Sequence, residues 1–216
     1  NKNSVDKSNY FLIVHEPGHS NNPKYYIDNF STKELVSGLK REDLKKLPDT
    51  SKSDTAKITT NKKGKNVFAD NKDKLGLSKT AYNFMGGIMN SAEALTAWFN
   101  PTINSYKRIN APVTASGATW APNTITYSGN NRTHMVRVPG PGRFELRLMD
   151  GATNPYLLQA GILAAGIDGI EKKRNPGKPI NVNMYEEGHK VKGAKKLPFT
   201  LEKALSHLDK SKVLKD

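Results

Sequence analysis

Residues 143–148 alternate charged and apolar side chains, and this pattern constrains the fold more than any other part of the sequence. Because successive side chains of a strand point to opposite faces, Arg143, Glu145 and Arg147 are expected to share one face of a strand. The apolar residues of the segment are expected to face a core. A carboxylate flanked by guanidiniums can form simple surface ion pairs, but it can also hold a hard cation beside bound carboxylate or phosphate oxygens. The strand alone leaves both interpretations open.

The composition fits a chain that buries a core without disulfides. The sequence has 216 residues, of which 36% are hydrophobic and none is cysteine, and this length favours one domain or one and a half. The lack of cysteine excludes thiolate metal sites and a cysteine nucleophile, and it is consistent with a reducing compartment. The apolar runs near the start are too short for a membrane span or a signal peptide, so we expect a cytoplasmic protein without membrane contact.

The formal net charge of +14 raises the question of nucleic-acid binding. The lysines are spread through loops, however, and do not form one helical face interleaved with stacking aromatic residues. We therefore expect the arginines to bind small anionic substrates, and nucleic acid is not an expected partner.

Residues 1–60 form a polar N-terminal segment in which no family is recognised. The string from His15 through Glu16 to His19 matches the H-E-x-x-H pattern of zinc metalloproteases, which needs both histidines on one helical face. Pro17 and Gly18 lie inside this string and disfavour a helix. A turn after a strand at residues 11–14 is the favoured interpretation of this string. A zinc metalloprotease is therefore only the third expected function, after the two described below.

Two long helices are expected after residue 61. The spacing of apolar residues predicts a helix at residues 78–99, in which Gly86 and Gly87 are unfavourable unless another segment packs closely there. Asn154 predicts the N-terminal cap of a second and more apolar helix at residues 156–170. The other expected elements are strands at residues 66–69, 124–128 and 132–138, an extended segment at 176–185 and a helix at 201–208.

Several motifs from Asn100 onward occur in the order and spacing of one enzyme family. They are Asn100-Pro101-Thr102, Asn104-Ser105-Tyr106-Lys107-Arg108, Tyr127-Ser128, Asn131-Arg132, Arg137, Arg143-Phe144-Glu145-Leu146-Arg147, Asp150-Gly151-Ala152 and Asn154-Pro155-Tyr156-Leu157. Together they resemble the glutamine synthetase family, from about residue 63 to the end of the chain. The resemblance implies an α+β fold in which residues 61–216 form the C-terminal part of a catalytic domain, with helices packed on an antiparallel sheet.

The resemblance also implies an ATP-dependent ligase that phosphorylates the side-chain carboxylate of glutamate and lets an amine displace the phosphate. The implied cofactors are ATP and Mg2+ or Mn2+, and phosphoryl transfer of this kind depends on positioning and charge neutralisation. The implied site residues are Arg132 and Glu145 for catalysis, Arg108, Arg132 and Arg147 for glutamate, Arg132, Arg137 and Arg143 for the nucleotide, and Glu145 for the metal. His134 is out of phase with Arg137, and we expect it to be a packed neighbour and not a catalytic base.

The resemblance stops short of a complete site. In the family, most metal-binding carboxylates and a glutamate-binding Asn-Gly loop precede the matched part, and residues 1–60 contain neither. Complete members also build each active site between neighbouring subunits of a homo-oligomer. We therefore expect this chain alone to be inactive as a ligase. The alternative is a catalytically inactive remnant, or a module that binds glutamate or nucleotide.

The loop that ends at Ala121 leaves the amine acceptor open. Trp120 stands where family members usually have a glutamate that helps to deprotonate ammonium. The sequences of residues 117–122 and 139–142 resemble those of the branch that includes glutamate–methylamine ligases. An indole in place of a carboxylate would favour an amine with an apolar group, through burial and cation–π contact. Both ammonia and a small alkylamine are therefore expected candidates.

Overall fold

The structure, a computed structural model, describes residues 13–14, 25–26, 65–111 and 121–215. Strand β1 (Ile13–Val14) pairs antiparallel with β2 (Tyr25–Tyr26), and β1 falls within the strand expected at residues 11–14. The proposed zinc motif at residues 15–19, most of residues 1–60 and Trp120 lie outside the described residues.

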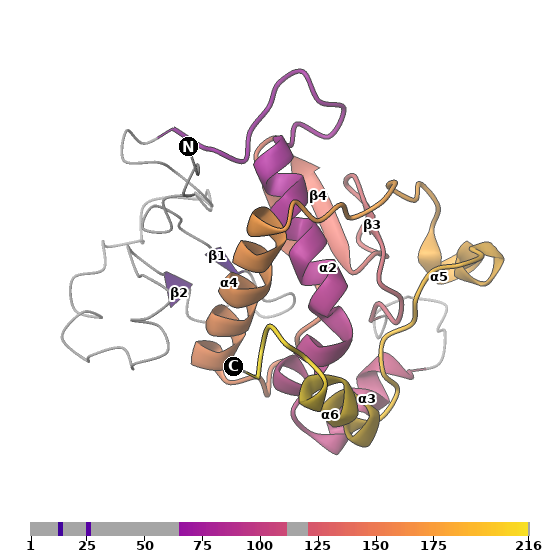
Figure 1. The fold of residues 1–216 in the computed structure, drawn as a ribbon. Coiled ribbons are helices and arrows are strands. Elements are labelled where there is room, and N and C mark those ends of the chain that lie inside the picture. The colour runs from indigo at the N-terminus through magenta and orange to yellow at the C-terminus, as the bar shows by residue number, and fades with distance from the viewer. Residues whose placement is uncertain (1–12, 15–24, 27–64, 112–120, 216) are drawn as a thin grey trace.

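The main body combines helices with a small sheet, which confirms the α+β class (Figure 1). Its elements are α2 (Lys79–Phe99), α3 (Ile103–Ile109), β3 (Tyr127–Ser128), β4 (Val136–Gly140), β5 (Arg143–Leu146), α4 (Pro155–Glu171), α5 (Met184–Glu187), the 3-10 helix η2 (Gly188–Lys190) and α6 (Leu201–Asp209). Among the described residues, none of these helices is both long enough and apolar enough to cross a membrane.

Helices α2 and α4 lie side by side and form the centre of the fold (Figure 1). The predicted start of α2 is confirmed, since the Ser78 hydroxyl accepts a hydrogen bond from the Ala81 amide at 3.2 Å. A Cβ added to Gly87 would lie 2.7 Å from the Gly169 Cα, so the two backbones approach as closely as glycine allows. A Cβ added to Gly86 would lie 2.6 Å from the Arg174 carbonyl oxygen, so both adjacent glycines of α2 face backbone that packs too closely for a side chain.

The cap of α4 also follows the prediction. The Asn154 side chain accepts hydrogen bonds from the amides of Tyr156 (2.9 Å) and Leu157 (3.2 Å), and Pro155 occupies the first helical position. The helix at the end of the chain is confirmed as α6, one residue longer than expected.

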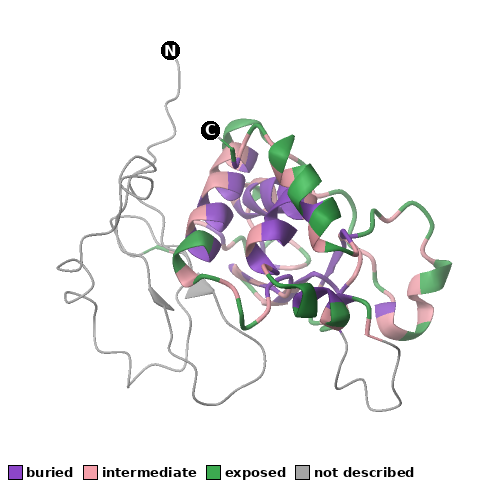
Figure 2. Cartoon of the chain, turned by 90° about the horizontal axis from the view of Figure 1, so that it is seen from below, coloured by how far each residue is buried: buried purple, intermediate pink, exposed green. Residues whose placement is uncertain are grey.

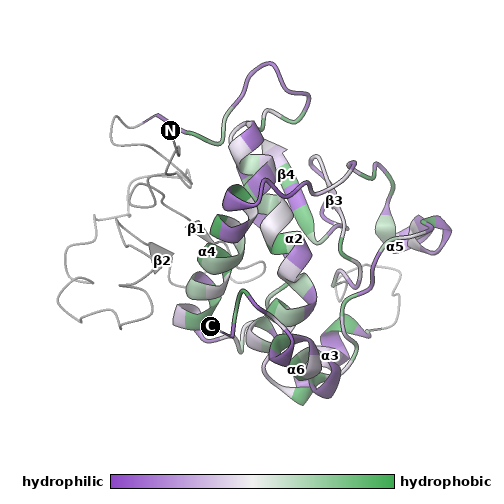
Figure 3. Ribbon diagram, viewed as in Figure 1, coloured by the Kyte–Doolittle hydropathy of each residue, from purple (hydrophilic) through white to green (hydrophobic). Residues whose placement is uncertain are grey.

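The apolar face of β5 packs against α2, as its alternation predicts. Phe144, Leu146 and Leu148 are buried, whereas the charged residues of the segment are only partly buried. The Phe144 ring lies 5.9 Å from the Phe68 ring, which in turn lies 5.3 Å from Phe84 of α2. Buried residues line the facing sides of the helices in Figure 2, and the apolar residues of α2 and α4 mark the same core in Figure 3.

The sheet has the order β3-β4-β5 and is mixed. Strands β4 and β5 are antiparallel and place Arg137 opposite Glu145, whereas β3 runs parallel to β4. The expectation of an antiparallel sheet therefore holds for the pair that carries the site and is wrong for β3.

Local hydrogen bonds shorten two of the predicted strands. Arg132 does not lie on a strand, because the Asn131 carboxamide oxygen accepts bonds from the Thr133 amide (3.0 Å) and hydroxyl (2.7 Å) and turns the chain. The strand expected at 132–138 therefore begins only at Val136. Similarly, the Asn66 side chain accepts a bond from the Phe68 amide at 2.8 Å, and residues 66–69 form a turn with isolated bridges in place of a strand.

Two further boundaries differ from the prediction, and one helix was not predicted. The strand expected at 124–128 is reduced to β3, while Thr124 forms an isolated bridge with Lys196. The extended segment expected at 176–185 ends in α5, whose start is capped by Asn183. Helix α3 was not predicted, and a capping box formed by Thr102 and Ser105 stabilises it.

Candidate active site

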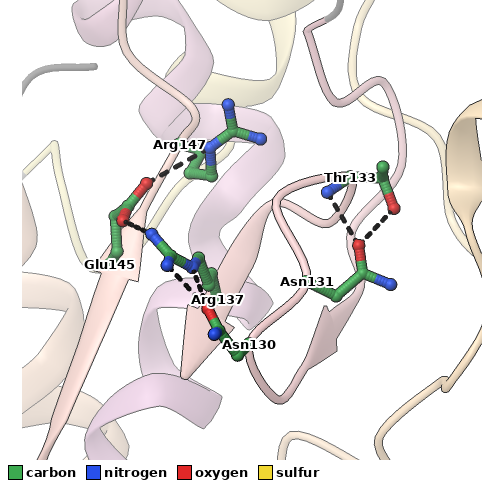
Figure 4. Close-up of polar contacts among 6 residues, drawn as sticks. All are labelled: Asn130, Asn131, Thr133, Arg137, Glu145 and Arg147. Atoms are coloured by element: carbon green, nitrogen blue, oxygen red, sulfur yellow. Dashed lines mark hydrogen bonds and ion pairs between the residues drawn. The ribbon is translucent and has the colours of Figure 1, made fainter. Parts of the chain in front are cut away.

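Glu145 lies between two guanidiniums on the charged face of the β4–β5 pair (Figure 4). Arg137 donates a hydrogen bond from Nη1 to Glu145 Oε2 at 2.8 Å. Arg147 Nε lies 3.3 Å from Oε1, an ion pair whose geometry falls short of a hydrogen bond. The three side chains are 13–21% exposed, so water screens these contacts only partly. Both carboxylate oxygens therefore face an arginine.

Asn130 holds the other edge of the Arg137 guanidinium. Its carboxamide oxygen accepts bonds from Arg137 Nε at 2.8 Å and from Nη2 at 2.6 Å. All three guanidinium nitrogens thus donate to protein groups, and only the second hydrogen of each terminal nitrogen is left for a ligand. Arg137 is fixed in orientation more firmly than the sequence indicated.

Arg108 and Arg147 bring a second pair of positive charges together. Arg108, on α3, donates from Nη2 to Asn100 Oδ1 and to Leu148 O, both at 2.9 Å. Among the described residues, buried N–H groups without a hydrogen-bond partner include Arg108 Nε and Arg147 Nη1. Buried donors of this kind are costly unless an acceptor reaches them.

The pKa shifts of both arginines reflect this crowding. Burial lowers the pKa of Arg108, and the Asp150 carboxylate opposes this effect while the Arg147 charge adds to it. Burial likewise lowers the pKa of Arg147, which Glu145 opposes and which the charges of Arg132 and Arg137 reinforce. Arginine stays protonated under such shifts, so Arg108, Arg132, Arg137 and Arg147 concentrate positive charge that the carboxylates of Glu145 and Asp150 do not balance. The arrangement is suited to bind carboxylate or phosphate oxygens.

The turn that carries Arg132 is tied to the segment before α5. Val182 O accepts one bond from Asn131 Nδ2 at 2.9 Å and another from His134 Nε2 at 3.0 Å. Because a carbonyl only accepts, His134 carries its proton on Nε2, and Nδ1 accepts from the Thr126 hydroxyl at 3.0 Å. His134 is fully buried, which confirms it as a packed neighbour.

We expect His134 to make the fold sensitive to acid. Burial lowers its pKa below the usual 6.5, and the bond to Val182 O opposes this only in part. The unfolded chain therefore binds the proton more readily than the folded chain. The stabilisation from the neutral imidazole should be complete above pH 6.5 and should be lost as the pH falls below that value.

Urea unfolding across this pH range measures the effect. The fall in the free energy of unfolding below pH 6.5 should be smaller in His134→Gln, whose amide can still donate to Val182 O. The matched control is His189→Gln, because His189 is exposed on η2 and should leave the slope unchanged. Equal slopes for the wild type and His134→Gln would contradict the expectation.

Arg143 opens β5 opposite Gly140, two residues before Glu145 and on the same face by alternation. The site therefore draws Arg137, Arg143, Glu145 and Arg147 from the sheet region, Arg132 from a turn and Arg108 from α3.

The described residues do not by themselves form a metal centre. They contain no group of three or more His, Cys, Asp or Glu side chains that could hold a metal ion. Divalent hard cations take about six oxygen ligands, whereas Glu145 offers two oxygens that already face Arg137 and Arg147. Further ligands would have to come from outside the described residues.

Asn100 and Asn130 are the residues whose contacts sequence reasoning missed. Asn100 belongs to the Asn100-Pro101-Thr102 motif but had no predicted role, and Asn130 was predicted only to lie in a turn. Asn100 binds Arg108 and Asn130 binds Arg137, eight and seven positions further along the chain, and hydrophobic periodicity does not predict such contacts. A buried asparagine at the end of a long helix is a weak signal that could have identified Asn100.

The comparisons with known proteins define the class to which this fold and site belong. Residues 56–216 match the model of the family described as "Glutamine synthetase, catalytic domain". The chain therefore belongs to the glutamine synthetase catalytic-domain family. The match begins near the predicted boundary at residue 61, although the division into two parts remains a prediction.

Its relatives include more than one kind of ligase. The chain is 61% identical over 151 residues to a glutamine synthetase of Rhizobium meliloti (strain 1021), covering 70% of this chain and 35% of the relative. It is 46% identical over 156 residues to a glutamate–methylamine ligase of Methyloversatilis universalis, covering 70% and 35%. A solved "GmaS/ADP complex-Conformation 1" matches with a TM-score of 0.67 and 58% identity, over 72% of this chain and 36% of that one. The chain thus spans about a third of the length of these relatives.

Proposed function

We propose that this chain supplies the arginine-rich part of an active site that ligates an amine to the side-chain carboxylate of glutamate, at the expense of ATP and through a γ-glutamyl phosphate. The observation that carries the proposal is the pair of partly buried guanidiniums, Arg108 and Arg147, which retain buried N–H donors without a hydrogen-bond partner among the described residues. Such donors, beside further arginines, are complementary to a dicarboxylate and to phosphoryl oxygens.

Within this proposal, glutamate lies against Arg108, Arg132 and Arg147. A carboxylate would satisfy Arg108 Nε and Arg147 Nη1 and would relieve the repulsion between the two charges. Arg132 stands in a turn next to the Arg147 charge, where it can face the oxygens of the transferred group. A second arginine near a phosphoryl group stabilises the charge that spreads over its oxygens.

The nucleotide would be held by Arg132, Arg137 and Arg143. Arg132 is exposed and Arg143 is partly exposed, whereas Arg137 can give a nucleotide only its remaining hydrogens. ATP would supply the phosphoryl group, and a divalent cation, Mg2+ or Mn2+, would supply further positive charge. Glu145 would be one ligand of that cation, with the others coming from outside the described residues.

A second candidate is a module that binds glutamate or nucleotide without chemistry. The observation in its favour is that both Glu145 oxygens face arginines in the described residues, which leaves the carboxylate engaged. For the ligase, we propose ammonia or methylamine as acceptor and assembly into a homo-oligomer, in line with the names of the two relatives for the acceptor.

A chimera tests the proposal. Residues 61–216 would replace the corresponding part of the Rhizobium meliloti glutamine synthetase, so that the rest of that enzyme supplies what this chain lacks. We expect phosphate release from MgATP that requires glutamate and an amine, and comparison of ammonia with methylamine identifies the acceptor. Glu145→Gln should reduce the rate at least about 10-fold.

The matched control is Glu202→Gln, the same isosteric change on the exposed surface of α6, which should leave the rate unchanged. A chimera that folds and binds glutamate but releases no phosphate with either amine would contradict the ligase proposal and favour the binding module.

A further inference from the structure

Asn100 is a fully buried polar residue directly after the last residue of α2. Its amide Nδ2 donates to Leu148 O at 3.0 Å, and its Oδ1 accepts from Arg108 Nη2 at 2.9 Å. The same Arg108 nitrogen also donates to Leu148 O at 2.9 Å. Three groups from separate parts of the chain therefore share a closed set of hydrogen bonds.

This set of bonds connects two of the three arginines proposed to bind glutamate, Arg108 and Arg147. Arg108 is bound directly, and Leu148 is the residue after Arg147. The backbone is joined in the same place, because the Asp150 amide donates to Phe99 O at 3.1 Å and the Arg147 amide donates to Met135 O at 2.8 Å. The end of α2 is thus fixed against the segment that follows β5.

We propose that Asn100 is a positioning residue that orients the Arg108 guanidinium and sets its place relative to Arg147. This inference rests on the proposed function for the identity of the ligand, glutamate. By occupying Arg108 Nη2, Asn100 and Leu148 O fix the rotation of the guanidinium and leave Nε as a buried donor for a carboxylate. A donor held in place costs less conformational entropy when the ligand binds.

The chemistry requires an amide at this position. Leu148 O needs a donor and Arg108 Nη2 needs an acceptor, and an asparagine side chain presents one of each. Aspartate would bring a carboxylate oxygen to Leu148 O, where neither atom can donate, and its charge would compete with the ligand for Arg108. Alanine would leave Leu148 O and the Arg108 guanidinium with one bond fewer each.

The test compares Asn100→Ala and Asn100→Asp with Asn110→Ala in the full chain. Asn110 is a control of the same residue type, because its Nδ2 also donates to backbone carbonyls, of Tyr106 at 2.8 Å and Phe199 at 3.0 Å, but among the described residues its side chain has no recorded hydrogen bond to a guanidinium. We expect both Asn100 variants to raise the Kd for glutamate about 10-fold, and Asn110→Ala less than about twofold. The Kd for MgATP should not change, which separates lost positioning from lost folding.

A measurement on the unmodified chain keeps the inference testable if the variants do not fold. NMR of the arginine side chains should show slow rotation of the Arg108 Nη2 group, compared with Arg143 in the same sample. Fast rotation of Arg108, or equal glutamate affinity in Asn100→Ala and Asn110→Ala, would overturn the inference. If the unmodified chain binds no glutamate, the proposed function fails, while the rotation measurement still decides whether Asn100 orients Arg108.

Discussion

Replacing Arg147 with methionine is expected to weaken glutamate binding about 100-fold without lowering the stability of the fold. The Arg147 side chain is 13% exposed, its buried Nη1 has no hydrogen-bond partner in the described structure, and among the described residues it forms an ion pair only with Glu145, at 3.3 Å. Glu145 would keep its 2.8 Å bond from Arg137. Removing a ligand's buried charge partner costs roughly 3 kcal/mol. The fold should not lose stability in the same way, because Glu145 is not left as an unpaired charge, and methionine fills a similar volume.

The matched control is Arg174→Met. Arg174 Nε pairs with Asp168 Oδ2 at 2.6 Å at the end of α4, so its loss should lower the free energy of unfolding and leave glutamate affinity unchanged. Calorimetric titration and urea unfolding of both variants provide the two readouts. If Arg147→Met lost stability like Arg174→Met and kept its glutamate affinity, Arg147 would be a structural residue.

Gly87→Ala is expected to have the largest effect on stability, at about 3 kcal/mol or more. The new Cβ would meet backbone atoms, with Gly169 Cα at 2.7 Å and the Ala165 carbonyl oxygen closer still, and backbone cannot rotate away. Helices α2 and α4 would have to separate along the core that includes Phe84 and Leu163. This loss would outweigh the helix propensity that alanine gains over glycine, about 1 kcal/mol.

Gly140→Ala is the control for this change, since a Cβ at Gly140 would have no atom within 4 Å. Urea unfolding should show that Gly140→Ala is within about 0.5 kcal/mol of the unmodified chain. A Gly87→Ala protein as stable as Gly140→Ala would mean that α2 and α4 do not pack through their glycines.

The sequence predicted those parts of the fold that short-range rules determine. The caps at Ser78 and Asn154 follow from local side-chain bonds, and the burial of Phe144 and Leu146 follows from strand alternation. Local rules also explain the errors. The Asn131 side chain bonds the Thr133 amide and hydroxyl and stabilises a turn where a strand was expected. The alternation of charged residues around Arg132 does not distinguish a turn from a strand.

The site was harder to predict from the residues themselves. Alternation placed Arg143, Glu145 and Arg147 on one face, but the roles assigned to them came from the family resemblance and remain proposals. The contact between Asn100 and Leu148 joins residues 48 positions apart, and no local pattern encodes it. The parallel pairing of β3 likewise depends on how the loop returns and not on the β3 sequence.

Titration of the 15N-labelled chain with L-glutamate, followed by NMR, tests the central claim most directly. The claim is that Arg108 and Arg147 form a carboxylate site, so saturable shifts should appear at the side chains of both arginines and at the Leu148 amide. Equal concentrations of acetate should produce much smaller shifts, because acetate lacks the second carboxylate of glutamate, for which Arg132 is the third proposed arginine. Shifts with glutamate that are no larger than those with acetate, or that leave Arg108 and Arg147 unchanged, would contradict the account.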